Sequence, residues 1–272
     1  MMESINKKTL GKGKVITVAS GKGGTGKTTS VAALSSCLAV LGYKTLCIDF
    51  DVGMRNLDLS LAMQDFAVID FVDVATGRIE LMSAVSKAPM IPNLFFLTAP
   101  PGNIDLITDE SEDVSEADND SAINITAIKR MFEEIRENFD YCLIDAPPGI
   151  GSGLQLAVCD ADTAIIVTAG EDPTIRDAQQ TAAAIRNFGV DRLRLLVNRV
   201  DPKKYKIIKT TIDDIIDIVG VQLIGVIRED KYIFRALHAN TPLVLYKKRQ
   251  SAYDYLEVAH RIIGDNVPLQ SI

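Results

Sequence analysis

The sequence has no apolar run long enough to cross a bilayer. Its 272 residues contain no uncharged apolar stretch of about 18 residues, which is the minimum for a membrane-spanning helix. The N-terminal run MMESINKKTLGKGK also lacks the apolar segment of a signal peptide. These two absences predict a soluble chain that stays inside the cell.

Histidine and cysteine are too few and too scattered to predict a metal centre. The two histidines, His238 and His260, lie far apart in the sequence, and no two of the 4 cysteines form a C-x-x-C pair. Reduced thiols in the core of a cytosolic protein are therefore expected at Cys37, Cys47, Cys142 and Cys159.

The chain also lacks an excess of positive charge. Lys and Arg number 29 against 36 Asp and Glu, so the net charge is −7 and the isoelectric point is about 5.0. A protein this acidic is not globally attracted to nucleic acid or to an anionic membrane, although a local basic patch can still bind one. Two such basic runs are Lys203, Lys204, Lys206 and Lys209, and Lys247, Lys248 and Arg249. We expect both to be exposed, solvated faces, and binding of nucleic acid stays open but not favoured.

Short apolar runs alternate with segments of helical periodicity. The predicted strands are Val15–Ala19, Thr45–Phe50, Leu94–Leu97, Tyr141–Asp145, Ala164–Thr168, Leu193–Asn198 and Leu223–Ile227. Most are continuously apolar, which suits strands buried on both faces of a parallel sheet. The predicted helices are Lys27–Leu41, Ile69–Ala75, Ala122–Glu137, Ile175–Phe188 and Tyr205–Val219. This alternation predicts an α/β fold with a single doubly wound, mostly parallel sheet and helices on both faces.

One domain is expected over residues 14–264, with tails at 1–13 and 265–272. Residues 109–120, DESEDVSEADND, are strongly acidic and predict a mobile surface loop. A helical stripe of Ala252, Leu256, Ala259 and Ile263 predicts that the last helix packs on the sheet. The tail after Gly264 contains an acid and a proline but no Lys or Arg, so it lacks the basic face of an interfacial membrane helix.

The strongest motif follows the first predicted strand. The run from Gly21 to Thr28 fits G-x-x-x-x-G-K-[ST] in full and lies between a predicted strand and a predicted helix. Glycines let successive backbone amides turn toward phosphates, and the following helix presents its positive end to the same anion. Lys27 would reach the β- and γ-phosphates, and the Thr28 hydroxyl would complete a Mg²⁺ shell. The residues expected to bind the nucleotide here are Gly21, Lys22, Gly23, Gly24, Thr25, Gly26, Lys27, Thr28 and Thr29.

A second lysine, Lys22, distinguishes this loop from a generic phosphate loop. K-G-G-x-G-K-T-T is similar to the deviant Walker A motif of the MinD/ParA family of ATPases. The resemblance extends over most of the chain and implies the P-loop NTPase fold, ATP and Mg²⁺ as cofactors, and an ATP-dependent homodimer. In that family the early lysine reaches the partner subunit's phosphates, so Lys22 would stabilise charge in trans, as an arginine finger does.

Two further segments resemble the switches of this family. Asp51 follows the second strand, and the resemblance makes it the residue that orients the attacking water and contacts the Mg²⁺ water shell. Asp49 is expected to be a structural partner. Asp145 ends an apolar strand as a Walker B aspartate does and would hold Mg²⁺ together with Thr28 and Asp51. Ala146-Pro147-Pro148-Gly149 resembles the second switch.

The resemblance also assigns two residues to the adenine pocket. Asn198 occupies the position that hydrogen-bonds the adenine edge in the family. Ile227-Arg228-Glu229-Asp230 resembles the loop that closes over adenine, usually I-P-E-D, with Arg228 in place of proline. The backbone of that loop is therefore expected to differ from the family's.

The preferred interpretation is a slow ATPase that acts as a dimerisation switch in cell division or spatial positioning. It would recruit an unidentified protein partner in its ATP state, from the cytoplasm, with at most transient membrane contact. A ParA-like DNA-associated partitioning ATPase is one alternative. An ATP-dependent ligase related to dethiobiotin synthase is another, although such an enzyme has little need of Lys22.

Overall fold

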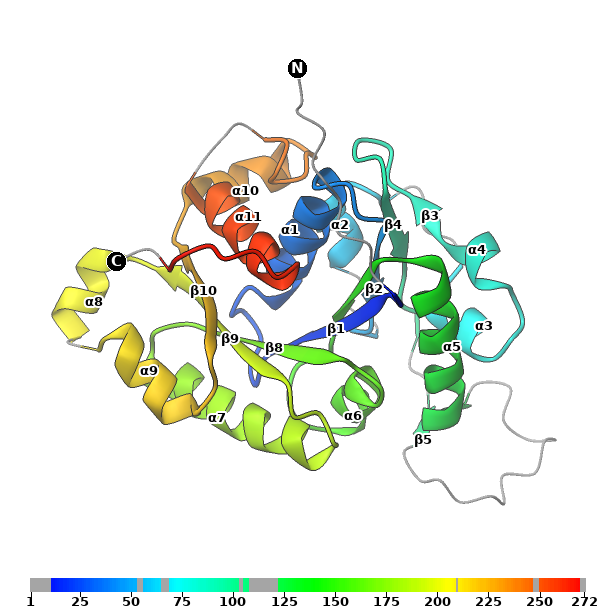
Figure 1. Cartoon of the computed structure of the whole chain (residues 1–272), viewed down its shortest axis with the longest axis horizontal. Coiled ribbons are helices and arrows are strands. Elements are labelled where there is room, and N and C mark those ends of the chain that lie inside the picture. The colour runs from blue at the N-terminus through cyan, green and yellow to red at the C-terminus, as the bar shows by residue number, and fades with distance from the viewer. Residues whose placement is uncertain are drawn as a thin grey trace.

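The computed structural model describes residues 11–52, 56–64, 69–102, 105–107, 122–208, 210–246 and 250–269. Its centre is an eight-stranded sheet with the order β10-β9-β8-β1-β7-β2-β4-β3 (Figure 1). The strands are β1 (Lys14–Ala19), β2 (Thr45–Asp49), β3 (Ser86–Lys87), β4 (Leu94–Leu97), β7 (Tyr141–Asp145), β8 (Thr163–Thr168), β9 (Leu193–Val200) and β10 (Leu223–Arg228). Neighbouring strands are parallel, except that β3 runs antiparallel to β4. The predicted mostly parallel α/β sheet is confirmed.

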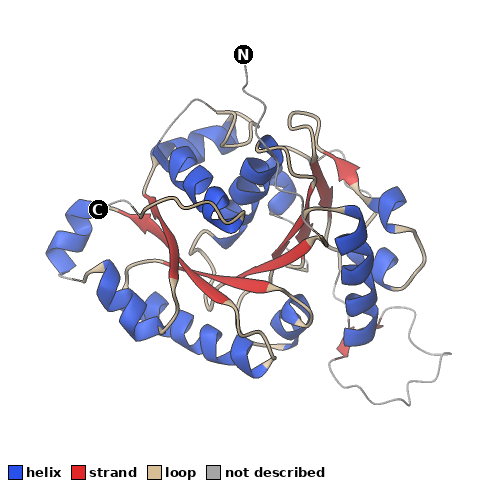
Figure 2. Cartoon of the chain, in the orientation of Figure 1, coloured by secondary structure: helices blue, strands red, loops and turns tan. Residues whose placement is uncertain are grey.

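Helices cover both faces of this sheet (Figure 2). They are α1 (Lys27–Val40), α2 (Leu57–Leu61), α3 (Phe71–Ala75), α4 (Leu81–Ala84), α5 (Ile125–Asn138), α6 (Ser152–Val158), α7 (Asp172–Asn187), α8 (Pro202–Ile208), α9 (Ile212–Val219), α10 (Lys231–His238) and α11 (Gln250–Ile262). Residues of α1, α2, α10 and α11 pack into one core, and residues of α3 to α7 and α9 pack into the other. Successive side chains of a strand point to opposite faces, so Val15 joins the second core and Ile16 the first.

The prediction of a single helix over Ala122–Glu137 is wrong at its start, because α5 begins only at Ile125. Its first residues form β6 (Ala122–Asn124), which pairs in parallel with β5 (Asp105–Ile107) in a separate two-stranded sheet. The side chain of Asn124 then accepts a hydrogen bond from the Ala127 amide at 2.9 Å and caps α5. An N-cap residue takes an extended backbone, which explains the change from strand to helix at this position.

The single helix predicted over Tyr205–Val219 is also wrong, since the chain forms α8 and α9. Thr211 begins the second of these by a reciprocal capping box. Its hydroxyl accepts from the Asp214 amide at 3.1 Å, while the Asp214 carboxylate accepts from the Thr211 amide at 2.7 Å. A capping box pairs backbone amides that would otherwise be unpaired at the start of a helix. It therefore begins a new helix here, although the apolar periodicity continues through this position.

The C-terminal helix lies where its apolar stripe predicts. Helix α11 packs on α1 and β10, with Ala252 and Ala259 buried in the core. The fully buried hydroxyl of Tyr255 forms a hydrogen bond with the hydroxyl of Ser30, 3.0 Å away. This contact joins α11 to the first turn of the helix that follows the glycine-rich loop.

The four cysteines are free thiols, and three of them are fully buried. Burial raises the pKa of the Cys37 thiol to about 12, so this side chain stays protonated at neutral pH. The predicted acidic loop at 109–120 and the run Lys247–Arg249 lie outside the described residues.

Candidate functional site

The residues predicted to bind the phosphates and Mg²⁺ lie at the carboxyl ends of β1, β2 and β7, which are neighbours in the sheet. The glycine-rich loop connects β1 to α1, whose first residue is Lys27. Asp49 ends β2 and Asp145 ends β7, and the two lie opposite each other in the pairing of these strands. Open parallel sheets bind their ligands at this edge. The fold therefore brings together carboxylates and a lysine that are far apart in the sequence.

The loop has a backbone that only glycine fits well. Gly24 and Gly26 have φ angles of 86° and 91°, in the left-handed region that side chains disfavour. A Cβ built on Gly26 would overlap the side-chain amide of Asn198, and one on Gly21 would overlap the backbone of Asp177. The glycine-rich loop therefore packs closely against Asn198 at Gly26 and against Asp177 at Gly21.

Two residues at the end of β9 hold the loop by its carbonyl groups. Asn198 donates from Nδ2 to the Thr25 carbonyl at 2.8 Å, and Arg199 donates from Nη1 to the Gly24 carbonyl at 2.9 Å. The Arg199 amide in turn donates to Asn198 Oδ1 at 2.9 Å. Asn198 was predicted only as an adenine contact, whereas no role was predicted for Arg199. No sequence pattern marks Arg199. It stands out only in the structure, where it has a left-handed φ of 58°, which is uncommon for a residue other than glycine.

Lys27 forms a buried ion pair with Asp145. Lys27 Nζ lies 2.5 Å from Asp145 Oδ1, and the two side chains are 7% and 1% exposed. Burial raises the pKa of Asp145, and the neighbouring Lys27 ammonium partly offsets this shift. The second carboxylate oxygen, Oδ2, is buried and has no hydrogen-bond partner. Buried oxygens of this kind are rare in native proteins, and this one is available to a ligand.

The other two carboxylates differ in environment. Asp49 is 1% exposed and accepts hydrogen bonds from the amides of Asp51 and Leu57 at 2.9 and 3.3 Å. Burial, together with the charge of Asp145, raises the pKa of Asp49 to about 7. Asp49 thus positions the segment that leaves β2, as expected of a structural partner. Asp51 is only half-buried, and burial raises its pKa as well.

The donor set fits a magnesium ion that is shared with phosphate oxygens. Among the described residues no three His, Cys, Asp or Glu side chains form a cage that would hold a metal by themselves. Mg²⁺ in phosphate sites uses one or two carboxylates, waters and the phosphates instead. Asp145, with its unpartnered oxygen, and Thr28, which lies close enough to lower the pKa of Asp145, meet this requirement.

The remaining loop residues are connected to the second predicted switch. The Gly149 amide donates to the Ser20 carbonyl at 3.3 Å, and the Ser20 hydroxyl donates to the Lys22 carbonyl at 3.0 Å. Lys22 itself is exposed, and so is Ile150, at 51%. The segment after β7 is therefore connected to the loop through Ser20, by one backbone and one side-chain hydrogen bond, while the Lys22 side chain faces outward.

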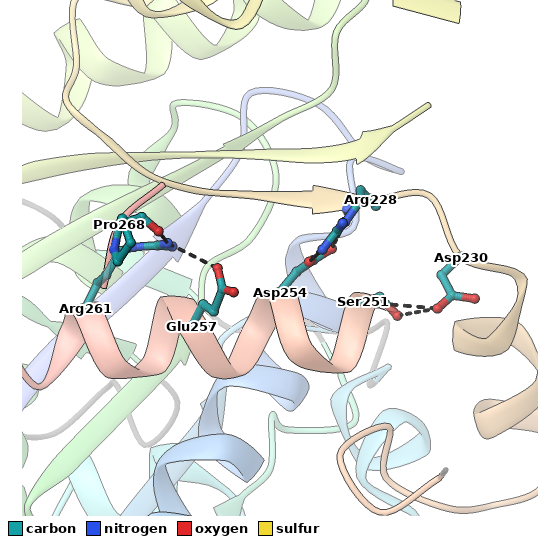
Figure 3. Close-up of polar contacts among 7 residues, drawn as sticks. All are labelled: Arg228, Asp230, Ser251, Asp254, Glu257, Arg261 and Pro268. Atoms are coloured by element: carbon teal, nitrogen blue, oxygen red, sulfur yellow. Dashed lines mark hydrogen bonds and ion pairs between the residues drawn. The ribbon is translucent and has the colours of Figure 1, made fainter. Parts of the chain in front are cut away.

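The structure places Arg228 at the end of β10 beside α11. Its guanidinium forms an ion pair with Asp254, and its amide donates to the same carboxylate at 2.9 Å (Figure 3). Two residues further on, Asp230 accepts from the Ser251 hydroxyl at 3.0 Å. Arg228 also lines a cavity of about 600 Å³ with Asp201 and Tyr232. In this structure α11 holds the Arg228 guanidinium through Asp254. The contact between Arg228 and the nucleotide therefore stays a prediction.

Comparison with known proteins agrees with this arrangement. A family model described as an AAA domain matches residues 13–195. The chain is 33% identical to the septum site-determining protein MinD of Bacillus subtilis (strain 168) over 260 residues, 95% of this chain and 92% of that protein. It is similar to a chain of the MinC:MinD cell division protein complex of Aquifex aeolicus, with a TM-score of 0.82, 33% identity, and coverage of 95% of this chain and 98% of that one. Another similar structure is the septum site-determining protein MinD complexed with Mg-ADP from Pyrococcus horikoshii OT3, with a TM-score of 0.74, 28% identity, and coverage of 92% and 95%. The chain belongs to the MinD family of P-loop ATPases.

Proposed function

We propose that this chain binds Mg-ATP at the glycine-rich loop and hydrolyses it as a MinD-type dimerisation switch in cell division or spatial positioning. The observation that carries the proposal is the buried Lys27–Asp145 pair beside an unpartnered Asp145 oxygen. A buried pair of charges is a weak source of stability, because desolvation offsets most of the attraction. A functional role accounts better for the presence of this ion pair next to the phosphate loop.

Each residue then has a definable role. The amides of Gly21 to Thr29 bind the phosphates, with the carbonyls of Gly24 and Thr25 already held from β9. The Lys27 ammonium can exchange Asp145 for phosphate oxygens, which leaves the carboxylate free to hold Mg²⁺ with Thr28. Bound Mg²⁺ would neutralise charge on the phosphate oxygens.

Asp51 is the candidate for orienting the attacking water. It follows the strand that ends at Asp49, and its amide is fixed by that carboxylate. Because Asp51 is half-buried, its carboxylate can accept a hydrogen bond from a water and remain open to the site. Asn198 and Arg228 are proposed as contacts to the nucleotide base, with Asn198 acting also on the loop.

Hydrolysis is proposed to require a second copy of the chain. The exposed Lys22 is suited to reach phosphates in a partner subunit, since its own loop needs only its backbone. The ATP-bound homodimer would then present a surface for another protein. The occurrence of a MinD relative in a complex with MinC supports this type of partner.

The proposed location is the cytoplasm, with any membrane contact transient. The four free cysteines, three of them buried, suit a reducing compartment. No helix in the described ranges is long and apolar enough to cross a membrane. The tail is held to α11, where Arg261 donates to the carbonyls of Val267 and Pro268 at 3.0 and 2.7 Å.

Binding to DNA gains little support from the described part of the chain. Within the first basic run, Lys204 pairs with Glu229 at 2.8 Å, and the second run lies outside the described residues. The net charge of −7 opposes association with a polyanion.

Calorimetry with ATP, in the presence and absence of Mg²⁺, tests the proposal. We expect magnesium-dependent binding to the wild-type protein, slow release of phosphate, and a shift from monomer to dimer with ATP. The absence of magnesium-dependent affinity for ATP would overturn the assignment of the site. Normal binding without any phosphate release, at high protein concentration, would overturn the ATPase role alone.

A further inference from the structure

A second cavity lies at the opposite edge of the sheet from the glycine-rich loop. It has a volume of about 430 Å³ and is lined by residues at or beside the amino ends of β1, β7, β8, β9 and β10, and by the end of α11. Cavities of this size hold small ligands. Since the nucleotide site occupies the carboxyl ends of the strands, the two sites are separated by the length of the sheet.

Three cations line this cavity without an acidic partner. Lys14, Arg192 and Arg194 form no ion pair with any residue in the described ranges. The side-chain hydrogen bond of Arg194 goes to its neighbour, the Leu193 carbonyl, at 2.8 Å. Partial burial and the nearby charge of Arg192 lower the pKa of Arg194. Arg194 is half-buried and Arg192 is exposed. An anion bound between their guanidinium groups would offset the repulsion between these two charges.

The nearby carboxylates are engaged elsewhere. Asp265 pairs with His260 at 2.8 Å, and Asp140 accepts from the Lys44 amide at 2.7 Å. Arg261, a fourth cation of the lining, forms an ion pair with Glu257 at 3.2 Å and donates to the Pro268 carbonyl at 2.7 Å (Figure 3). It also donates to the Ile224 carbonyl at 3.1 Å, so its guanidinium is held in place at the end of α11. Neither Asp265 nor Asp140 forms an ion pair with Lys14, Arg192 or Arg194 in the part of the chain that the structure describes.

Much of the remaining lining is apolar, beside the polar side chains of Tyr141, Thr163 and Gln222. Ile16, Ile165 and Ile224 are buried strand residues of the core on the α11 side of the sheet, and the half-buried Ile262 and Ile263 leave apolar surface exposed at the end of α11. A simple inorganic anion would leave this surface in contact with water. An apolar group on the anion would cover it and gain the free energy of burial.

We propose that this cavity binds an amphipathic anion, a carboxylate or phosphate ester attached to an apolar group. The guanidinium groups of Arg192 and Arg194 bind the anion with help from Lys14, and the isoleucines contact the apolar group. Both a soluble metabolite and the headgroup of an anionic lipid have this chemistry. The site does not depend on nucleotide hydrolysis, so this inference stands apart from the proposed function.

Calorimetry with octyl phosphate and with inorganic phosphate tests the site. We expect octyl phosphate to bind and inorganic phosphate to bind more weakly. The double variant Arg192→Gln/Arg194→Gln should weaken octyl phosphate binding at least about tenfold, because hydrogen bonds between charged groups are lost. Arg130→Gln, on the exposed surface of α5, is the matched control and should bind as the wild type does.

Two readouts keep the test independent of folding and of the ATP site. Mg-ATP affinity, measured on the same samples, should be unchanged in the double variant, because the nucleotide site is at the other edge. If the double variant does not fold, Lys14→Gln alone should still weaken octyl phosphate about threefold. The absence of octyl phosphate binding to wild type, or equal binding by the cavity variants, would overturn the proposal.

Vesicles distinguish the two sources of the anion. Retention on phosphatidylglycerol vesicles but not on phosphatidylcholine vesicles, lost in the double variant, supports a lipid headgroup. Binding of octyl phosphate without retention on either kind of vesicle supports a soluble amphipathic ligand.

Discussion

Arg199 donates a hydrogen bond from its guanidinium to the carbonyl of Gly24, 2.9 Å away and 175 residues earlier in the chain. Beside it, Asn198 binds the next carbonyl, that of Thr25. A phosphate loop works through its amides, and fixing successive carbonyls on one side limits where those amides point. The end of β9 therefore pre-organises the loop before any nucleotide arrives.

This arrangement predicts that Asn198→Ala weakens the binding of GTP as well as that of ATP. The loop carbonyls lose their partner whichever base is bound, and the expected loss is about tenfold for a buried hydrogen-bond pair. Arg199→Ala should weaken both nucleotides by a smaller factor, because its side chain is exposed. Calorimetry with both nucleotides measures this. A loss confined to ATP would mean that Asn198 acts on adenine alone.

Lys27→Ala is expected to abolish measurable Mg-ATP binding. The substitution removes the charge that faces the phosphates and leaves Asp145, which is 1% exposed, without its counter-ion. Thr28→Ala should instead spare nucleotide binding without metal and reduce the gain that Mg²⁺ brings. Fluorescent-nucleotide titrations with Mg²⁺ and with a chelator separate the two effects. Retained affinity in Lys27→Ala would contradict the assignment of this lysine.

Lys22→Ala should bind ATP normally and lose hydrolysis by about 10³-fold or more, the range known for residues that act in trans. Mixing subunits makes the test specific. In a hybrid dimer of Lys22→Ala with Asp51→Asn, one of the two sites keeps both a native Asp51 and the partner's native Lys22. An equal mixture should therefore recover roughly a quarter of wild-type activity if half of the dimers are hybrids. A mixture as inactive as each variant alone would show that Lys22 acts within its own subunit.

Much of the fold and the centre of the site could be predicted because they depend on local sequence. Continuous apolar runs identify buried parallel strands, and the fixed spacing of glycine, lysine and threonine in G-x-x-x-x-G-K-[ST] identifies the phosphate loop. Local sequence patterns did not predict the contacts that form only in the tertiary structure. Nothing around Arg199 reveals that its guanidinium reaches Gly24, and nothing near Asp49 reveals that Asp145 will be its neighbour and raise its pKa. The two helix errors have a different origin, because Asn124 and Thr211 are recognisable caps that lie inside segments with suitable apolar spacing.

The contribution of Asp49 to the free energy of unfolding should fall as the pH rises from 3.8 to about 7. Its pKa is higher in the folded state than in the unfolded state, so the folded protein binds a proton more tightly. This contribution to stability is complete below pH 3.8 and is lost as the pH passes about 7. Asp49→Asn removes the titrating group and should reduce the slope, although Asp51 and Asp145 have raised pKa values with the same sign.

Urea unfolding at several pH values between these limits measures the slope. Asp217→Asn, an exposed aspartate on α9, is the matched control and should leave the slope as it is in the wild type. An Asp49→Asn protein with the wild-type pH dependence would contradict the raised pKa.

The ion pair between Arg228 and Asp254 joins the end of β10 to α11. Arg228→Gln leaves a carboxylate that is 3% exposed without its counter-ion, which should reduce the free energy of unfolding by about 2 kcal/mol. The Arg228 amide still donates to Asp254, so the loss should be smaller than for a fully isolated charge. Adding Asp254→Asn to Arg228→Gln should restore part of the stability, because no buried charge then remains.

Lys204→Gln, which breaks the exposed pair with Glu229, is the control for this experiment and should cause no measurable change. Nucleotide titrations on the same variants decide the second role predicted for Arg228. If its side chain serves only the contact with α11, then Arg228→Gln will lower stability and keep the affinity for ATP. A matching loss of ATP affinity at a pH and temperature where the variant is fully folded would instead place the guanidinium in the nucleotide pocket.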